Sequence, residues 1–242
     1  MRWIIALIGL LMALPAAGQG LTLTGAGTFA GGGGGGGSFT TWDSVTYAAN
    51  WTFTNGNLTA ACKAAFCGSG NQGIVASTNP VNPTTDTRKL YWEITPSVTG
   101  ADSTFAVGFG TALCMSGGSG SGLNAGGCVG VYMNGDVAAN GTLLPAFLPP
   151  YTTGTIIAFA YDFGGKLLWV KEGCAGLWNN SGTANPGTGT GGGAVDFSGT
   201  TPPLNTTLAM LDGFNGNANG GTLNAGATAF ACTIPSGFVR WQ

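Results

Sequence analysis

Beyond about residue 43, short strand-like segments alternate with clusters of Gly, Asn, Pro and Ser, and helical periodicity of apolar residues is almost absent. Apolar and polar side chains alternate over 89–95, which predicts a half-buried strand. The segment 156–161 is apolar on both faces and is predicted to be central. In 104–111 one face carries only small residues, which predicts close approach of another layer. The pattern predicts an all-β fold.

Two turn sequences predict hairpins within this region. The first joins 51–54 to 58–59 through Asn55-Gly56, a favoured pair for tight turns. The second joins 156–161 to 167–170 through Gly164-Gly165.

The chain divides into three predicted parts. Residues 1–18 carry one charge, a short apolar run and a small-residue ending, which is the pattern of a cleaved signal peptide. Residues 19–42 include seven consecutive glycines at 31–37 and are predicted to be a flexible tether. Residues 43–242 are predicted to be one domain. We therefore expect a secreted or periplasmic protein with no stable membrane anchor after cleavage.

The six cysteines have to be interpreted together with export. In an oxidising compartment an even count predicts disulfides. Two pairs are close in sequence, and the last two cysteines are left for each other by elimination. The predicted pairs are Cys62 with Cys67, Cys114 with Cys128, and Cys174 with Cys232. A cysteine zinc site and free buried thiols are the alternatives, although the sequence has no Cys-x2-Cys motif.

The charge content excludes several classes of function. The net charge is -2, only 7% of the residues are charged, and the chain has no basic block, so nucleic-acid binding is not expected. The chain also has no histidine, which removes His-dependent triads and His-ligated zinc.

Neither a catalytic nor a metal site is predicted. The only glutamates are Glu93 and Glu172, and neither has a second acid along its strand as a retaining glycosidase would need. Asp162 is interpreted as a turn former. The 212–220 segment copies the first half of a calcium loop, but it lacks the closing acidic ligand and is interpreted as an Asn/Gly-rich loop. We expect no cofactor.

The order of segments resembles the SPRY family, in particular exported and phage-encoded SPRY-like proteins. The segments that carry the resemblance are NGNLT (55–59), RKLYWEIT (88–95), VGFG (107–110), VGVYMNG (129–135), IIAFAYD (156–162), GKLLWVKEG (165–173), TLNAG (222–226) and IPSGF (234–238). The resemblance implies a bent sandwich of two antiparallel sheets, a concanavalin-like jelly roll, that binds partners, usually proteins, through loops at one end.

The expected function is non-catalytic recognition of a protein partner outside the cytoplasm. The loops expected to bind are 114–128, 145–153, 173–197 and 212–221. Tyr151 and Trp178 are the expected anchors, because they and Trp42 occur in polar or Gly/Pro-rich surroundings, where exposed aromatic side chains are typical of recognition sites. The alternatives are a carbohydrate-binding or glycan-cleaving jelly roll, and a structural surface or virion component.

Overall fold

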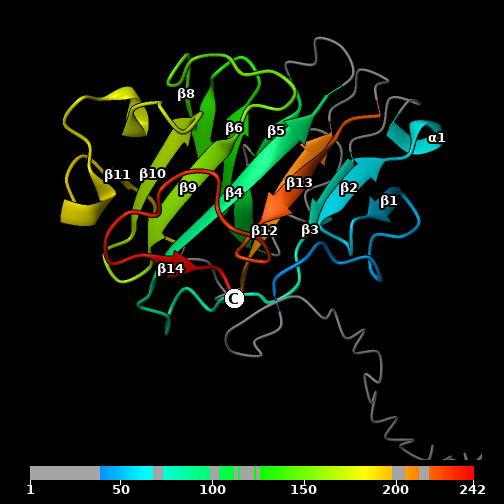
Figure 1. Ribbon diagram of the computed structural model, residues 1–242, viewed down its shortest axis with the longest axis horizontal. Coiled ribbons are helices and arrows are strands. Elements are labelled where there is room, and N and C mark those ends of the chain that lie inside the picture. Colours follow the sequence, from blue (N-terminus) through cyan, green and yellow to red (C-terminus); the bar gives the residue numbers. More distant parts are fainter. Residues whose placement is uncertain are drawn as a thin grey trace, which may run out of the picture. The chain divides into compact units, whose positions relative to one another are not determined.

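Two β-sheets pack on each other in the computed structural model, which describes residues 39–67, 73–98, 104–111, 114, 123, 126–197, 205–212 and 218–242 (Figure 1). The predicted signal peptide (1–18) and residues 19–38 of the predicted tether lie outside these ranges. Residues 39–42 are described, and here Thr40 and Trp42 are completely buried. The packed part of the domain therefore includes residues that precede position 43.

Within the described residues, the first sheet has eight strands. Seven follow the order β1-β2-β13-β4-β9-β10-β11, and β14 pairs with β4 in parallel. The strands are β1 (Trp51–Thr54), β2 (Thr59–Cys62), β4 (Lys89–Ser97), β9 (Ile157–Asp162), β10 (Leu167–Glu172), β11 (Gly193–Ala194), β13 (Gly220–Asn224) and β14 (Val239–Arg240).

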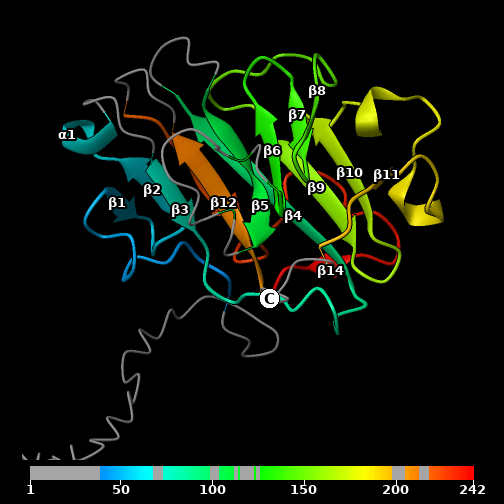
Figure 2. The same ribbon diagram turned by 180° about the vertical axis from the view of Figure 1, so that it is seen from behind.

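The second sheet has six strands within the same residues, in the order β3-β12-β5-β6-β7-β8 (Figure 2). All its neighbours are antiparallel. The strands are β3 (Gly73–Ala76), β5 (Ala106–Thr111), β6 (Cys128–Tyr132), β7 (Val137–Ala139), β8 (Thr142–Leu144) and β12 (Thr206–Asp212). A short helix α1 (Ala64–Cys67) and two 3-10 helices, η2 (Trp178–Asn180) and η3 (Pro186–Thr188), lie between strands. The predicted all-β two-sheet sandwich is confirmed.

Aromatic rings fill the space between the sheets. Trp92 of β4 stacks on Phe159 of β9 at 5.1 Å between ring centroids. Phe109 of β5, in the other sheet, meets the Trp92 ring edge-on at 5.0 Å. Trp241 also contacts Trp92 at 5.0 Å. Trp92 and Phe109 are among the inward residues that alternation along β4 and β5 predicts.

The outer face of the first sheet is also covered. Tyr91 and Ala160 on this face are completely buried, in a small second cluster with Trp169 and Phe238. In Figure 1 the C-terminal segment before β14 crosses in front of β9 and β4. The expectation that β4 is half buried is therefore wrong, because the sequence pattern of one strand does not show which distant segment covers it.

The small residues of β5 allow close approach on the outer face of the second sheet. A Cβ atom on Gly110 would meet the side chain of Cys114 at 2.8 Å. Cys114 and Leu123 pack in this outer cluster. The predicted close approach is confirmed.

Both predicted hairpins form. β1 pairs with β2 across a turn in which Asn55, Gly56 and Asn57 have positive φ. β9 pairs with β10, and Lys166 has positive φ in that turn. As predicted for a segment that is apolar on both faces, β9 lies between two neighbours, β4 and β10.

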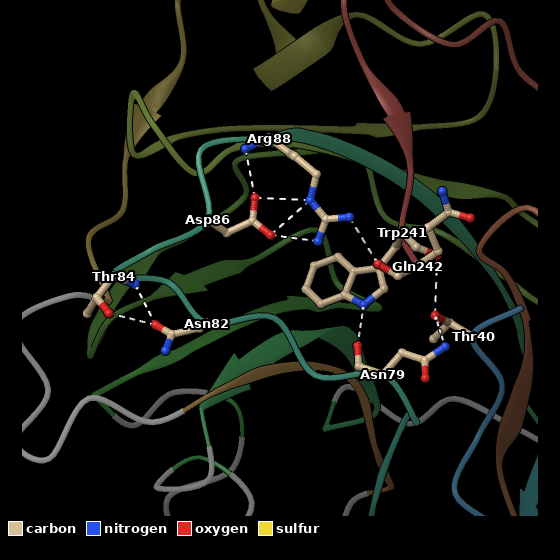
Figure 3. A network of polar contacts seen from close by, with 8 residues as sticks. All are labelled: Thr40, Asn79, Asn82, Thr84, Asp86, Arg88, Trp241 and Gln242. Carbon is tan, nitrogen blue, oxygen red and sulfur yellow. Dashed lines mark hydrogen bonds and ion pairs between the residues drawn. The ribbon is translucent and has the colours of Figure 1, made fainter. Parts of the chain in front are cut away.

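Segments from the two ends of the described chain close the sandwich together (Figure 3). The Trp241 indole donates to the Asn79 carbonyl at 3.1 Å, and the Thr40 hydroxyl donates to the Trp241 carbonyl at 3.2 Å. Arg88 pairs with Asp86 and also donates to the Gln242 carbonyl at 3.1 Å.

Candidate functional site

Three of the four predicted binding loops adjoin one end of the sandwich, namely 145–153, 173–197 and 212–221. In the first sheet, the registers place the first residues of β13 (Gly220) and β9 (Ile157) at the same end of β4. The last residue of β10 pairs opposite Ile157. The chain therefore enters or leaves the sheet at this end in all three loops.

The remaining loop, 114–128, belongs to the opposite end. β12 pairs with β5 so that Leu211 lies opposite Ala106 and Thr206 lies opposite Thr111. The loop after β12 is therefore beside Ala106, whereas 114–128 follows Thr111. The strands that this loop joins therefore meet it at the opposite end from the other three loops, and residues 115–122, 124 and 125 of the loop lie outside the described residues.

A groove of about 360 Å³ separates the edges of the two sheets and brings two of the predicted loops together. Phe147 from the loop 145–153 lines one side, and Val195 from 173–197 lines the other. We call this the edge groove. Its lining residues are Val137, Ala139, Asn140, Thr142, Leu144, Phe147, Leu168, Val170, Asn179, Gly193, Ala194 and Val195. Most of these side chains are apolar.

Asn179 shapes the side of the edge groove formed by the first sheet. Its amide group donates to the carbonyls of Leu168 and Gly191, at 3.1 and 2.9 Å. Its side-chain oxygen accepts from the Val170 N–H at 2.9 Å. The Asn179 side chain thus occupies backbone groups of β10 beyond the short strand β11, and protects that edge from pairing with another strand.

The opposite side of the edge groove ends in an exposed edge strand. Every residue of β8 is exposed, with Leu143 at 46% and Leu144 at 39%. The turn Asn140-Gly141 before it has positive φ at both residues, as a two-residue hairpin of type I′ requires. Sequence reasoning missed these leucines, although the Asn-Gly pair before a Thr-Leu-Leu run could have indicated an edge hairpin.

The two predicted anchors lie in different surroundings. Tyr151 is only 2% exposed, and its hydroxyl donates to the Val131 carbonyl at 2.8 Å. The expectation that its ring is exposed is therefore wrong, because the ring belongs to the core between the sheets. Trp178 is partly exposed, and the Lys171 ammonium lies 4.8 Å from its ring centroid. The structure does not bring the two rings together.

A pair of opposite charges is buried beneath the cover of the first sheet. Glu93 and Lys171 both pair with Ala158, on its two sides, so a small side chain separates them in one cross-strand row. The Glu93 carboxylate accepts from the Tyr91 hydroxyl at 2.7 Å and from the N–H groups of Ala231 and Cys232. The polar groups of Glu93 are therefore used in holding the C-terminal segment on the sheet.

Burial and the Glu93 carboxylate shift the pKa values of two neighbouring groups, Tyr91 and Lys171. Burial raises the pKa of Tyr91, and the hydrogen bond to Glu93 and its charge add to the increase. Burial lowers the pKa of Lys171, and the charge of Glu93 opposes part of the decrease. Both directions favour neutral forms in a dry environment.

The two glutamates do not form a catalytic pair. Glu93 and Glu172 occupy successive cross-strand rows of the first sheet, since Glu93 lies opposite Ala158 and Glu172 lies opposite Ile157. Successive rows point to opposite faces of a sheet. A two-carboxylate hydrolysis site needs both groups on one side of the substrate bond, so this geometry does not provide one.

The cysteines pair as predicted from the sequence. The Cα atoms are 6.1 Å apart in Cys62–Cys67, 5.3 Å in Cys114–Cys128 and 4.9 Å in Cys174–Cys232, all within the range for disulfides. The third pair connects the loop after β10 to the C-terminal segment. Lys171 donates to the Cys174 carbonyl at 3.0 Å, and Glu93 accepts from the Cys232 N–H. Each of the two buried charges therefore contacts the backbone of one cysteine of this disulfide.

Of the segment 212–220 that copies part of a calcium loop, residues 213–217 lie outside the described residues. Among the residues that are described, no cluster of three or more His, Cys, Asp or Glu side chains is placed to hold a metal ion. In the same part of the chain, no helix is long and apolar enough to cross a membrane.

Comparison with known proteins gives structural matches alone. No protein-family model matches the sequence, and no curated protein matches it. The SPRY domain of human HERC1 is similar with a TM-score of 0.49 at 11% identity, over 74% of this chain and 94% of that chain. A human SPRY domain is similar with a TM-score of 0.49 at 12% identity, over 74% of this chain and 98% of that one.

The TRIM65 PSpry domain is similar with a TM-score of 0.49 at 10% identity, over 77% of this chain and 92% of that chain. These neighbours are SPRY domains. They are of the family that the sequence resembles.

Proposed function

We propose that this domain is a non-catalytic recognition module that acts outside the cytoplasm and binds a protein partner at the edge groove and the loops beside it. The observation that carries the proposal is the meeting of two predicted loops, through Phe147 and Val195, in one apolar groove between two sheet edges. Loops fixed on a β core are common sites of recognition. The leader-like segment 1–18 and the three cysteine pairs support action in an oxidising compartment.

A protein partner is favoured over a glycan by the surroundings of Trp178. Sugar rings stack on an open aromatic face, and the Lys171 ammonium lies over one face of the Trp178 ring. The exposed side chains at the edge groove include two large apolar ones, Leu144 in its lining and Leu143 next to it in β8. Apolar side chains of this kind fit the buried centre of a protein interface.

The test uses the full chain with its cysteine pairs intact as bait for extracellular proteins of its source, with captured proteins quantified by mass spectrometry. Leu144→Glu places a charge in the edge groove, and because Leu144 is already 39% exposed the fold is expected to remain. Val45→Glu is the matched control, since Val45 is 87% exposed and does not line the groove.

We expect one or more proteins to be captured by the parent and by Val45→Glu and lost with Leu144→Glu. Equal capture by all three proteins would contradict binding at the edge groove. Binding of the parent to a glycan array, lost in Trp178→Ala, would instead favour the carbohydrate alternative.

A further inference from the structure

A second groove lies on the C-terminal segment, outside the edge groove. It has a volume of about 610 Å³ and is open to solvent. Its apolar lining includes Phe230, Phe238, Ile234 and Val239, of which the last two are 37% and 48% exposed. None of its lining residues is acidic. We call it the C-terminal groove.

Arg240 is the cation of this groove, and its side chain is held in place from three sides. Its aliphatic stem packs against Gly226, where a Cβ atom would collide with it. Its guanidinium lies 5.1 Å from the ring centroid of Phe39, and its Nε donates to the Gln242 side chain at 2.9 Å. The backbone carbonyl of Gln242 in turn accepts from Arg88 at 3.1 Å, which holds Gln242 beside Arg240 (Figure 3).

The guanidinium has no carboxylate partner among the described residues. Arg88, Lys89 and Lys166 each form an ion pair with an aspartate there, and Arg240 does not. Arginine has five N–H donors in a planar fork that matches a carboxylate, and the bond to Gln242 uses only one of them. An arginine so placed beside an apolar groove is complementary to an anion that carries an apolar group.

The open shape of the groove indicates what carries that anion. Small-molecule sites enclose most of the ligand surface, which an open groove does not do. An extended peptide can lie along such a surface and place one side chain in the apolar part while a neighbouring carboxylate reaches the arginine.

From these observations we propose that the C-terminal groove docks an extended segment of a partner protein that bears an aliphatic or aromatic side chain next to an Asp or Glu. This site is separate from the edge groove, and no residue lines both.

The probe is a phage-displayed library of random peptides, selected on the full chain and, in parallel, on Arg240→Gln. Enriched peptides are then synthesised and their affinities are measured by fluorescence polarisation. Lys166→Gln is the matched control, because it removes one partly exposed cation that does not line the C-terminal groove. Circular dichroism and thermal unfolding verify that the variants are folded.

We expect enrichment of sequences that join an apolar residue to Asp or Glu. Their affinity should fall about tenfold or more with Arg240→Gln, or when their acid is replaced by its amide, and should be unchanged with Lys166→Gln. Should Arg240→Gln not fold, Ile234→Gln replaces it, because Ile234 is exposed and lines the groove.

Three results would overturn the proposal. They are a lack of enrichment, enriched peptides without an acidic residue, and equal binding to the parent and to the folded groove variant. Loss of peptide binding with Leu144→Glu would place the peptide in the edge groove and would also overturn it. The proposed function can fail without affecting this result, since its test depends on Leu144 alone.

Discussion

At the scale of single residues, Glu93 shows how a buried charge can hold two segments of the chain together. The side chain is 2% exposed, and it accepts one hydroxyl and two backbone N–H groups. These bonds, together with the nearby Lys171, offset the cost of removing a carboxylate from water. The carboxylate oxygens thus accept hydrogen bonds from Tyr91 and from the backbone of the C-terminal segment.

Glu93→Ala should lower the free energy of unfolding by about 3–5 kcal/mol, because it leaves the Tyr91 hydroxyl and the N–H groups of Ala231 and Cys232 without their acceptor. Urea unfolding followed by tryptophan fluorescence measures the loss. Glu172→Ala is the control, with a change within about 0.5 kcal/mol expected at this partly exposed position. Similar losses in both variants would show that Glu93 has no special structural role.

Tyr132 should make stability depend on alkaline pH. Burial raises its pKa to about 12, and the charge of Asp136 adds to the increase. Below pH 10 the folded and unfolded states both keep the phenolic proton, and above it the unfolded chain loses the proton first. The contribution of Tyr132 to stability is therefore present below pH 10 and is lost as the pH rises towards 12.

The measurement is the free energy of unfolding at several pH values between 10 and 12 for the parent and for Tyr132→Phe. The variant should lose less stability with pH, and the comparison cancels the other titrating groups, including Lys171. Identical slopes would mean that Tyr132 ionises normally in the folded protein.

At the scale of elements, the third cysteine pair connects two separate covers of one sheet. Cys174 belongs to the loop after β10 and Cys232 to the segment before β14, and both segments contribute to the cluster on the outer face. The pair Cys62–Cys67 connects a strand to the short helix that follows it. The two pairs therefore constrain the unfolded chain to different extents.

Replacing Cys174 and Cys232 together by serine should cost about 4 kcal/mol, and replacing Cys62 and Cys67 about 2 kcal/mol, in the chain-entropy model for separations of 58 and 5 residues. Chemical denaturation of the two double variants compares them directly. Equal losses, or a larger loss for the short pair, would contradict this ranking.

Elements that depend on local sequence were predictable, and those that depend on distant segments were not. Alternation gave the inward residues of β4, and turn chemistry gave the β1–β2 and β9–β10 hairpins, because period and turn type are local properties. The burial of Tyr91 depends on the C-terminal segment, far along the chain. The edge groove depends on which strands lie at the edges of the two sheets. Strand order cannot be predicted from the sequence of any single segment.

At the scale of the whole molecule, the position of a strand within its sheet sets its local stability against opening. β4, β9 and β12 have neighbours on both sides, whereas β8 is paired on one side and fully exposed. Backbone groups at such an edge open to solvent with little cost.

Hydrogen exchange should therefore be slowest in β4, β9 and β12 and fastest in β8. Exchange measured by mass spectrometry at peptide resolution tests this order in the native protein. Protection of β8 equal to that of β9 would indicate that another strand or chain covers this edge.

The contact between Thr40 and Trp241 joins residues 201 positions apart, and both are completely buried. During synthesis at about 5–20 residues per second, roughly 10–40 s separate the appearance of these two residues. Once they are synthesised, the rings of Trp92 and Phe159 lack, until the end of that interval, the indole that packs against Trp92 in the finished core. Until Trp241 is synthesised, the face of β4 that its indole covers therefore stays open to contact with other chains.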